Sequence, residues 1–181
     1  MKLIPLFLLA AVVVSGSALA QSANDAGLPA ASRGPFLVDG RAPSGAVCPS
    51  GVTTASFTGA NTQDGRIFRD AIPSACPNKA YPGIFNVGTT FNYEAFTYPN
   101  TSNAAACVTV NFDPDTAGTT PCATNAHASA YIGAYDPANQ AANYVGDVGS
   151  SLAQPFSFEV PANTDMVLVV TNTSSAAVCD F

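Results

Sequence analysis

Residues 106–112 read ACVTVNF, and their alternation of apolar with more polar side chains decides the fold class. Residues 156–160, FSFEV, repeat the alternation. A period of two places the apolar side chains on one face and the polar ones on the other, which is typical of a half-buried β-strand. The two stretches therefore predict strands whose Val and Phe side chains face a common core.

The rest of the chain continues this pattern in short segments. Further strands are expected at residues 53–58, 65–69, 90–98, 127–135 and 166–171. Turn-forming sequences rich in Asp, Asn and Pro separate them, and only residues 137–142 could form a turn of helix. About seven short strands predict an all-β fold, a single β-sandwich with Greek-key or jelly-roll connections over residues 46–181, stabilised by disulfides.

The residues before this domain are expected to direct secretion. Lys2, an apolar run over residues 3–14 and a closing Ala-Leu-Ala form the pattern of a cleaved signal peptide at residues 1–20. The run is shorter than the ~20 residues that a membrane span needs. Residues 21–45 lack periodicity and predict a flexible lead. We therefore expect a secreted chain, periplasmic or extracellular, without membrane insertion after cleavage.

The charge distribution excludes two classes of partner. Residues 80–181 contain eight carboxylates and no Lys or Arg, and the whole chain has a formal net charge of −6. Nucleic acid binding and anionic membrane surfaces both require basic side chains. We therefore expect no nucleic acid partner. Carbohydrate or another envelope protein fits a surface made largely of neutral polar groups.

Five cysteines follow the predicted signal peptide, where an oxidising compartment favours disulfides. Cys107 begins a predicted strand and Cys122 closes the loop after it, so these two are expected to form a local pair. Cys179 can pair with Cys76 or with Cys48, and we expect the pair Cys76–Cys179. Cys48 is then unpaired or competes with Cys76. A zinc site is disfavoured because the chain has no CxxC spacing and one histidine.

One segment, DPDTAG from Asp113, begins like a calcium-binding loop. The fifth position is Ala117 and the twelfth is Thr124, where the helix-loop-helix motif needs a bidentate glutamate. An ordinary turn is the preferred interpretation. A calcium site of another kind, using Asp113, Asp115 or Asp147, is left open, and no other cofactor is expected.

Two fragments imitate the signatures of trypsin-like proteases. They are TNAHA at residues 124–128 and GDVGS at residues 146–150. Val148 occupies the nucleophile position and has no hydroxyl, and His127 lies too close in sequence for the two-barrel scaffold. Ser150 is displaced by two positions. We therefore expect no catalytic residues here.

Tyrosines on the predicted strands offer a candidate ligand face. Tyr131 and Tyr135 share a face with His127 by the period of two. Flat rings backed by neutral polar groups suit stacking on sugars. Tyrosines at this spacing are more often semi-buried sheet residues, and burial is the preferred interpretation.

The order of several motifs resembles a known family. The motifs are GRIFRDAIPSAC at 65–76, YPG at 81–83, ACVTV at 106–110, AYIG at 130–133, NYVGD at 143–147 and FSFEVPA at 156–162. Together they resemble a β-sandwich module of bacterial secreted and cell-surface proteins, broadly similar to pre-peptidase C-terminal and jelly-roll modules. The resemblance covers residues 57–181. It implies an extracellular sandwich and no catalytic residues to carry over. The chain departs from the module after its last cysteine, because only Asp180 and Phe181 follow Cys179, and we expect its closing strand to be short.

These inferences predict a secreted, non-enzymatic binding or adhesive module at or beyond the cell envelope. The alternative is a structural subunit of a secreted assembly, in which a neighbour's lead (residues 21–45) completes the short final strand. A hydrolase of unfamiliar type is third. It would need an Asp/Glu pair drawn from Asp113, Asp147 and Glu159. The ligand and the oligomeric state are not determined by the sequence.

Overall fold

The structure is a computed structural model that describes residues 37–40, 52, 54–175 and 177–181. The predicted signal peptide and Cys48 lie outside the described residues. The elements in chain order are β1 (Leu37–Gly40), β2 (Thr62–Ile67), β3 (Ile84–Asn100), β4 (Ala106–Phe112), the 3₁₀ turn η3 (Ala123–Asn125), β5 (Ala126–Ile132), β6 (Tyr144–Asp147), β7 (Gln154–Val160) and β8 (Thr164–Asn172).

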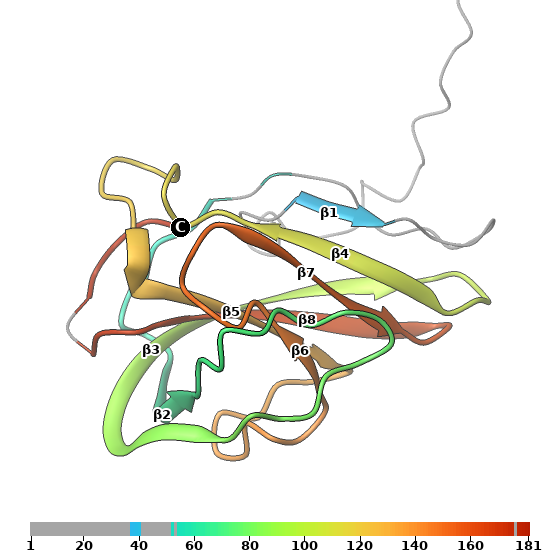
Figure 1. The fold of residues 1–181 in the computed structure, drawn as a ribbon, viewed down its shortest axis with the longest axis horizontal. Helices are drawn as coiled ribbons and strands as arrows, with labels where there is room; N and C mark the ends of the chain where they lie inside the picture. The colour runs from blue at the N-terminus through green and yellow to red at the C-terminus, as the bar shows by residue number, and fades with distance from the viewer. Residues whose placement is uncertain (1–36, 41–51, 53, 176) are drawn as a thin grey trace, which may run out of the picture.

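Two antiparallel sheets pack face to face, as the sequence predicts (Figure 1). One has the strand order β1-β4-β7 and the other has the order β2-β3-β8-β5-β6. The chain changes sheet from β1 to β2, from β3 to β4, from β4 to β5, from β6 to β7 and from β7 to β8. The expected all-β sandwich with crossing connections is therefore confirmed.

The ACVTVNF and FSFEV stretches form β4 and β7, which pair with each other. Val108 lies opposite Phe158 and Val110 lies opposite Phe156, and all four side chains are buried. Fully burying one such side chain stabilises the fold by about 1.5–3 kcal/mol. The alternation in the sequence therefore identified the inner face of the three-stranded sheet.

The main core lies between the two sheets. The five-stranded sheet adds the small Ala126, Ala128 and Ala130 of β5 and the larger Leu168 and Val170 of β8. Opposite β7, Gly146 of β6 leaves room for Phe158, whose Cβ would lie 3.5 Å from a Cβ at Gly146. A second, smaller apolar cluster lies on the other face of this sheet and contains most of the tyrosines.

Some predicted elements differ from the structure. The strand expected at 127–135 ends at Ile132, because Gly133 has a φ of +77° and turns the chain. β6 was not predicted. Four residues of the predicted flexible lead, Leu37–Gly40, form β1 and pair with β4. Residues 53–58 form no named strand, although Ser56 makes an isolated bridge.

An irregular segment, residues 71–79, closes one edge of the sandwich. Its Ser74 N–H donates to the carbonyl of Asp147 on β6 at 2.9 Å, and its Ser74 carbonyl accepts from the N–H of Ser157 on β7 at 2.8 Å. One residue thus bridges the edge strands of both sheets. Gly146 permits the close approach, because a Cβ there would lie 2.3 Å from Ser74 Oγ.

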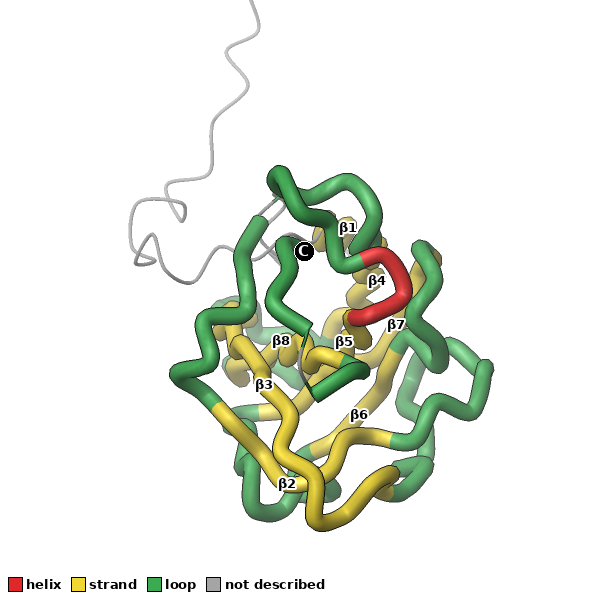
Figure 2. The backbone as a smooth tube through the Cα atoms, turned by 90° about the vertical axis from the view of Figure 1, so that its left-hand side faces the viewer, coloured by secondary structure: helices red, strands yellow, loops and turns green. Residues whose placement is uncertain are grey.

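The C-terminal segment, residues 179–181, closes one end of the sandwich, which faces the viewer in Figure 2. Phe181 exchanges two backbone hydrogen bonds with Ala55, at 2.7 and 2.8 Å. On its other side, Asp180 accepts from the N–H of Cys122 and donates to the carbonyl of Thr120, both at 2.8 Å. The short closing strand expected from the sequence is therefore an irregular segment that makes backbone hydrogen bonds on both sides, and Phe181 is fully buried.

Both predicted disulfides are wrong. The bonds join Cys76 to Cys107 and Cys122 to Cys179. β4 carries the chain away from Cys107 by about 3.3 Å per residue, and Cys122 lies beyond the far end of that strand. Cys107 is instead bonded to the 71–79 segment through Cys76, and Cys122 is bonded to the C-terminal segment through Cys179.

The two disulfides indicate an oxidising environment, extracellular or periplasmic. No helix in the described ranges is long and apolar enough to cross a membrane.

Candidate functional site

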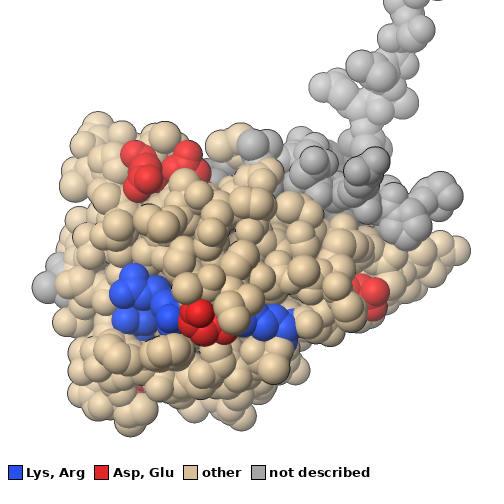
Figure 3. All heavy atoms as spheres, in the orientation of Figure 1, with Lys and Arg blue, Asp and Glu red and all other residues tan. Residues whose placement is uncertain are grey.

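Basic side chains in the described part of the chain come from one short stretch. They are Arg66, Arg69 and Lys79, and all precede the region that lacks Lys and Arg. In Figure 3 two basic areas and an acidic one lie in a row across one face of the molecule. The three cations have different surroundings, and these decide which of them can meet a ligand.

Lys79 is neutralised within the protein. Its Nζ lies 2.7 Å from Asp70 Oδ1 and 3.0 Å from Asp147 Oδ1, and it also donates to the carbonyl of Ile72. The Asp147 side chain is fully buried and also accepts hydrogen bonds from the Tyr144 hydroxyl and the Gly149 N–H. This network fastens the 71–79 segment to β6.

The network shifts the pKa of two buried groups. Burial acts to raise the pKa of Asp147, but His127 in its protonated form, the Tyr144 hydroxyl and Lys79 lower it by more, so it lies below its usual 3.8. Burial lowers the pKa of His127 below 6.5, and Asp147 only partly opposes this. His127 is therefore neutral at pH 7. Its Nε2 lies 3.7 Å from Asp147 Oδ1, too far for a hydrogen bond.

The two protease-like fragments lie side by side, but they do not form a protease arrangement. Val148 N–H donates to the Ala128 carbonyl at 3.0 Å, which places the fragments next to each other. Ser150 Oγ accepts from the Leu152 N–H at 3.2 Å and from Gln154 Nε2 at 2.8 Å. These contacts link Ser150 to its own loop and not to His127.

The three calcium candidates are not brought together. Asp113 accepts from the Asp115 N–H at 3.0 Å and from the Thr116 hydroxyl at 3.1 Å, which is the bonding of an ordinary Asp turn. Asp147 belongs to the Lys79 network. In the described part of the chain, no group of three or more His, Cys, Asp or Glu side chains is arranged to hold a metal ion.

The proposed tyrosine face is covered. Tyr131 and His127 share a face of β5, as predicted, but they are only 1% and 2% exposed. Tyr135 is half-buried, and its hydroxyl contacts Gln63. The candidate ligand face made of these three residues is therefore wrong, and the preferred interpretation of semi-buried tyrosines is confirmed. Tyr131 belongs to the smaller apolar cluster on this face, and four other tyrosines pack against that cluster.

Five tyrosines form a row of ring contacts on this face. Neighbouring ring centroids lie 4.6–6.0 Å apart, in the order Tyr81, Tyr144, Tyr131, Tyr135 and Tyr93. Burial raises the pKa of Tyr81 to about 12 and also raises the pKa of the other four. The row therefore forms a second small core, in which Tyr131 is buried and the other four tyrosines are partly buried.

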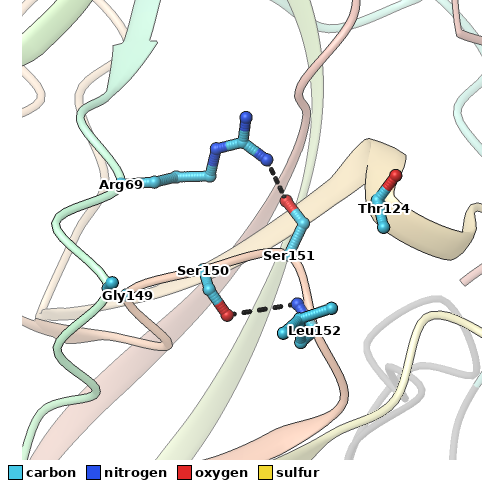
Figure 4. A pocket seen from close by; sticks show the side chains of 7 residues that line it. Arg69, Thr124, Gly149, Ser150, Ser151 and Leu152 are labelled. Carbon is cyan, nitrogen blue, oxygen red and sulfur yellow. Dashed lines mark hydrogen bonds between the residues drawn. The ribbon is translucent and has the colours of Figure 1, made fainter.

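An open hollow of about 350 Å³ lies beside Arg69. Its lining, shown in Figure 4, includes Arg69, Thr124, Gly149, Ser150, Ser151 and Leu152. These residues come from the segment after β2, from η3 and from the loop between β6 and β7. We call this feature the Arg69 hollow.

Backbone geometry brings the two main walls of the Arg69 hollow together. Gly149 has a φ of +73°, and a Cβ at this position would lie 2.5 Å from the Ile72 backbone. The Ala71 N–H donates to the Gly149 carbonyl at 2.9 Å. Only glycine fits this close crossing, which sets Arg69 against the serines of the loop.

Arg69 is an exposed cation with donors to spare. Its Nη1 donates to the buried Ser151 Oγ at 2.7 Å, which orients the guanidinium. Among the described residues, no carboxylate lies within ion-pair distance of Arg69. A guanidinium carries five N–H donors, so most of those on Arg69 remain available to a ligand.

Arg66 lies nearby but is enclosed. It is 6% exposed, its guanidinium stacks on Phe85 with 4.5 Å to the ring centroid, and its Nη1 donates to the Ile67 carbonyl. Burial and the charge of Arg69 lower the pKa of Arg66 to about 10. Arg66 therefore contributes positive potential without a free contact surface.

Comparisons of the chain with protein-family models, with curated proteins and with solved structures found no match. The interpretation of the Arg69 hollow therefore depends on its own chemistry. Sequence reasoning missed the hollow because its walls lie about 80 residues apart. The available signal was that Lys and Arg stop at Lys79.

Proposed function

We propose that this chain is a secreted, non-enzymatic β-sandwich module that binds a ligand at or beyond the cell envelope, and that the Arg69 hollow is its binding site. The observation that carries the proposal is the exposed, oriented guanidinium of Arg69, which has no carboxylate partner among the described residues of an acidic protein. Concave sites with a few placed polar groups are where small ligands bind.

The non-enzymatic part of the proposal is supported by the positions of the carboxylates. Asp147 is buried and bound to Lys79, Asp113 bonds within its own turn, and Glu159 is exposed on β7. A general acid and base need to face one reacting group in a cleft. These three residues occupy three different settings.

A binding screen tests the proposal. The mature chain is applied to an array of neutral and acidic glycans and envelope proteins, together with Thr124→Trp, which adds a large ring at the rim of the Arg69 hollow. We expect a ligand that wild type binds and Thr124→Trp does not. Thr101→Trp, at an exposed position outside the hollow, is the matched control. Equal binding by all three proteins would place the site elsewhere.

A second candidate function, a structural subunit joined by strand addition, is favoured by β1. Four residues of the lead pair with β4 at the edge of the three-stranded sheet, so this lead can supply a strand. The acceptor in an assembly would be β4 and not the final strand, which is paired on both sides.

Size-exclusion chromatography over a range of concentrations tests this second candidate. Strand addition predicts oligomers that disappear in a Val38→Pro/Asp39→Pro variant, because proline cannot donate a backbone hydrogen bond to β4. A wild-type protein that stays monomeric at every concentration rules the assembly out.

A further inference from the structure

We propose that the Arg69 hollow binds a small sugar acid, with the ligand's carboxylate on Arg69 and its hydroxyls on the serine loop. This inference rests on the proposed binding function and names the ligand class for the same site. It is argued from the charge, the hydrogen-bonding groups and the size of the hollow.

The cation at the hollow suits a carboxylate. The planar guanidinium matches the two oxygens of a carboxylate through parallel N–H donors, and such bidentate pairs are stronger than neutral hydrogen bonds. The contact with Ser151 fixes one nitrogen of Arg69 and so reduces the freedom that a ligand must remove. A pre-oriented side chain loses less entropy when it binds.

The surrounding charges favour an anion at this point. Asp70, which follows Arg69 in the chain, and Asp147 both form ion pairs with Lys79, so these three groups carry a net charge of −1 between them. The two positive charges of Arg66 and Arg69 exceed it. Arg66 lies close enough for its charge to be felt by Arg69 and is itself enclosed by aromatic rings. An anion bound to Arg69 therefore relieves the repulsion between two guanidinium groups.

The loop opposite Arg69 offers hydroxyl groups. Ser150 Oγ uses its lone pairs to accept from Leu152 and Gln154, so its proton is free to be donated to a ligand oxygen. Thr124 is exposed at the rim. A ligand that carries several hydroxyls next to its carboxylate can use these groups, whereas a simple fatty acid cannot.

The size of the hollow limits the ligand to a single small unit. Its volume of about 350 Å³ is near the lower end of the ~300–1,000 Å³ of known small-molecule sites. Leu152 is exposed on one side and provides an apolar surface for the C–H face of a sugar ring. One hexuronate unit fits these limits.

Isothermal titration calorimetry with three probes tests the inference. Glucuronate carries the carboxylate and the sugar hydroxyls, glucose lacks the carboxylate, and acetate lacks the sugar. We expect glucuronate to bind best. Glucose should bind about tenfold or more weakly because it loses the charge-assisted contact with Arg69, and acetate should bind about tenfold more weakly because it loses several neutral hydroxyl contacts and the ring.

Variants assign the binding to the hollow. Arg69→Gln should weaken glucuronate binding about tenfold or more. Arg69→Lys should recover part of the affinity, because it keeps the positive charge but lacks the paired N–H donors of the guanidinium. Leu152→Ala should weaken binding less. Val178→Ala, at a position that is 73% exposed against 60% for Leu152 and lies outside the hollow, should have no effect. Unchanged thermal midpoints show that the variants are folded.

The outcomes separate this inference from the proposed function. Glucose binding that Arg69→Gln leaves unchanged but Thr124→Trp abolishes would overturn the sugar acid and keep the binding function. Acetate binding as tight as glucuronate would overturn the role of the hydroxyls. No glucuronate binding would overturn the inference outright, and the glycan array alone would then decide the proposed function.

Discussion

Two irregular segments close this sandwich, and they do so by different chemistry. The 71–79 segment is fixed by the ion pair between Lys79 and the buried Asp147 and by the Cys76–Cys107 disulfide. The C-terminal segment (179–181) is fixed by the Asp180 side chain, which accepts from the Ser56 hydroxyl and two backbone N–H groups, and by a second disulfide. The first segment is held by an ion pair to a buried carboxylate. The second is held by neutral donors that bind a carboxylate near the surface.

The difference shows where the molecule has room for a ligand. The C-terminal segment ends with Phe181 in the core and fills its end of the sandwich. The Lys79 of the 71–79 segment is paired with Asp70 and Asp147, whereas the neighbouring Arg69 lies beside an open hollow with no ion pair among the described residues. We therefore assign a structural role to the C-terminal segment and a site-forming role to the 71–79 segment.

The largest effect is expected from Lys79→Met. Asp147 would remain buried without its cation, which typically costs about 3–5 kcal/mol of unfolding free energy. Urea denaturation measures this loss. The double variant Lys79→Met/Asp147→Asn removes both charges and should be less destabilised than Lys79→Met alone. If the two variants unfold at the same urea concentration, the pair is not the main fastening of the 71–79 segment.

Removing either disulfide should cost about 2–4 kcal/mol, because each bond restricts the unfolded chain. Cys76→Ser/Cys107→Ser removes a link across 31 residues, and Cys122→Ser/Cys179→Ser removes one across 57. The chain-entropy model predicts a slightly larger loss for the longer link. Thermal unfolding compares the stabilities of the two double variants. Glucuronate affinity should fall only in Cys76→Ser/Cys107→Ser.

Gly149→Ala should cost about 1–3 kcal/mol, because the position combines a positive φ with a crossing backbone. Gly59→Ala is the matched control, since Gly59 has a φ of +75° but nothing within 4 Å of a Cβ. The difference between the two variants measures the contact with Ile72 alone. Equal losses would mean that the crossing at the Arg69 hollow is not tight.

Acid should lower the free energy of unfolding because the buried His127 resists protonation. Its pKa is lower in the folded protein than in the unfolded chain, so the unfolded chain takes up a proton first as the pH falls below 6.5. Stability is therefore full above pH 6.5 and declines as the pH falls toward the folded pKa. His127→Gln should flatten the unfolding free energy between pH 7 and 5. A profile that is unchanged in this variant would contradict the burial of a neutral ring.

The smallest effect is expected from Asp180→Asn. The amide oxygen still accepts a hydrogen bond, and the site is close to water. The pKa of Asp180 is lowered by its bonds to Ser56, Thr120 and Thr119, so the stability it contributes is present above its usual pKa of 3.8 and lost below the folded pKa. Differential scanning calorimetry should give a smaller shift than Lys79→Met. A larger shift would reverse the comparison of the two segments.

The sequence predicted the elements that depend on local alternation. β4 and β7 were correct because one face of each meets the core along its whole length. The disulfides were wrong because the 71–79 and C-terminal segments have no periodicity, so nothing local shows which strand they cross. The tyrosine face was half correct, since period two placed Tyr131 with His127 but did not show the loops that cover them.

The site could not be predicted for a related reason. Arg69 and Ser151 meet across 82 residues, and Gly149 looked like part of a protease motif and not like a crossing point. The absence of Lys and Arg after Lys79 led to the prediction that residues 80–181 have no nucleic acid or anionic membrane partner, and this stays a prediction. In the folded molecule it also means that the described cations all come from one stretch.

The most direct measurement is an NMR titration of the ¹⁵N-labelled chain with glucuronate. The account predicts shifts in the amide signals of Arg69, Ala71, Thr124 and residues 149–152, with the C-terminal segment unchanged and no shifts at these positions in Arg69→Gln. Shifts centred on the tyrosine row or on residues 179–181, or the same shifts in Arg69→Gln, would contradict the assignment of the Arg69 hollow as the binding site.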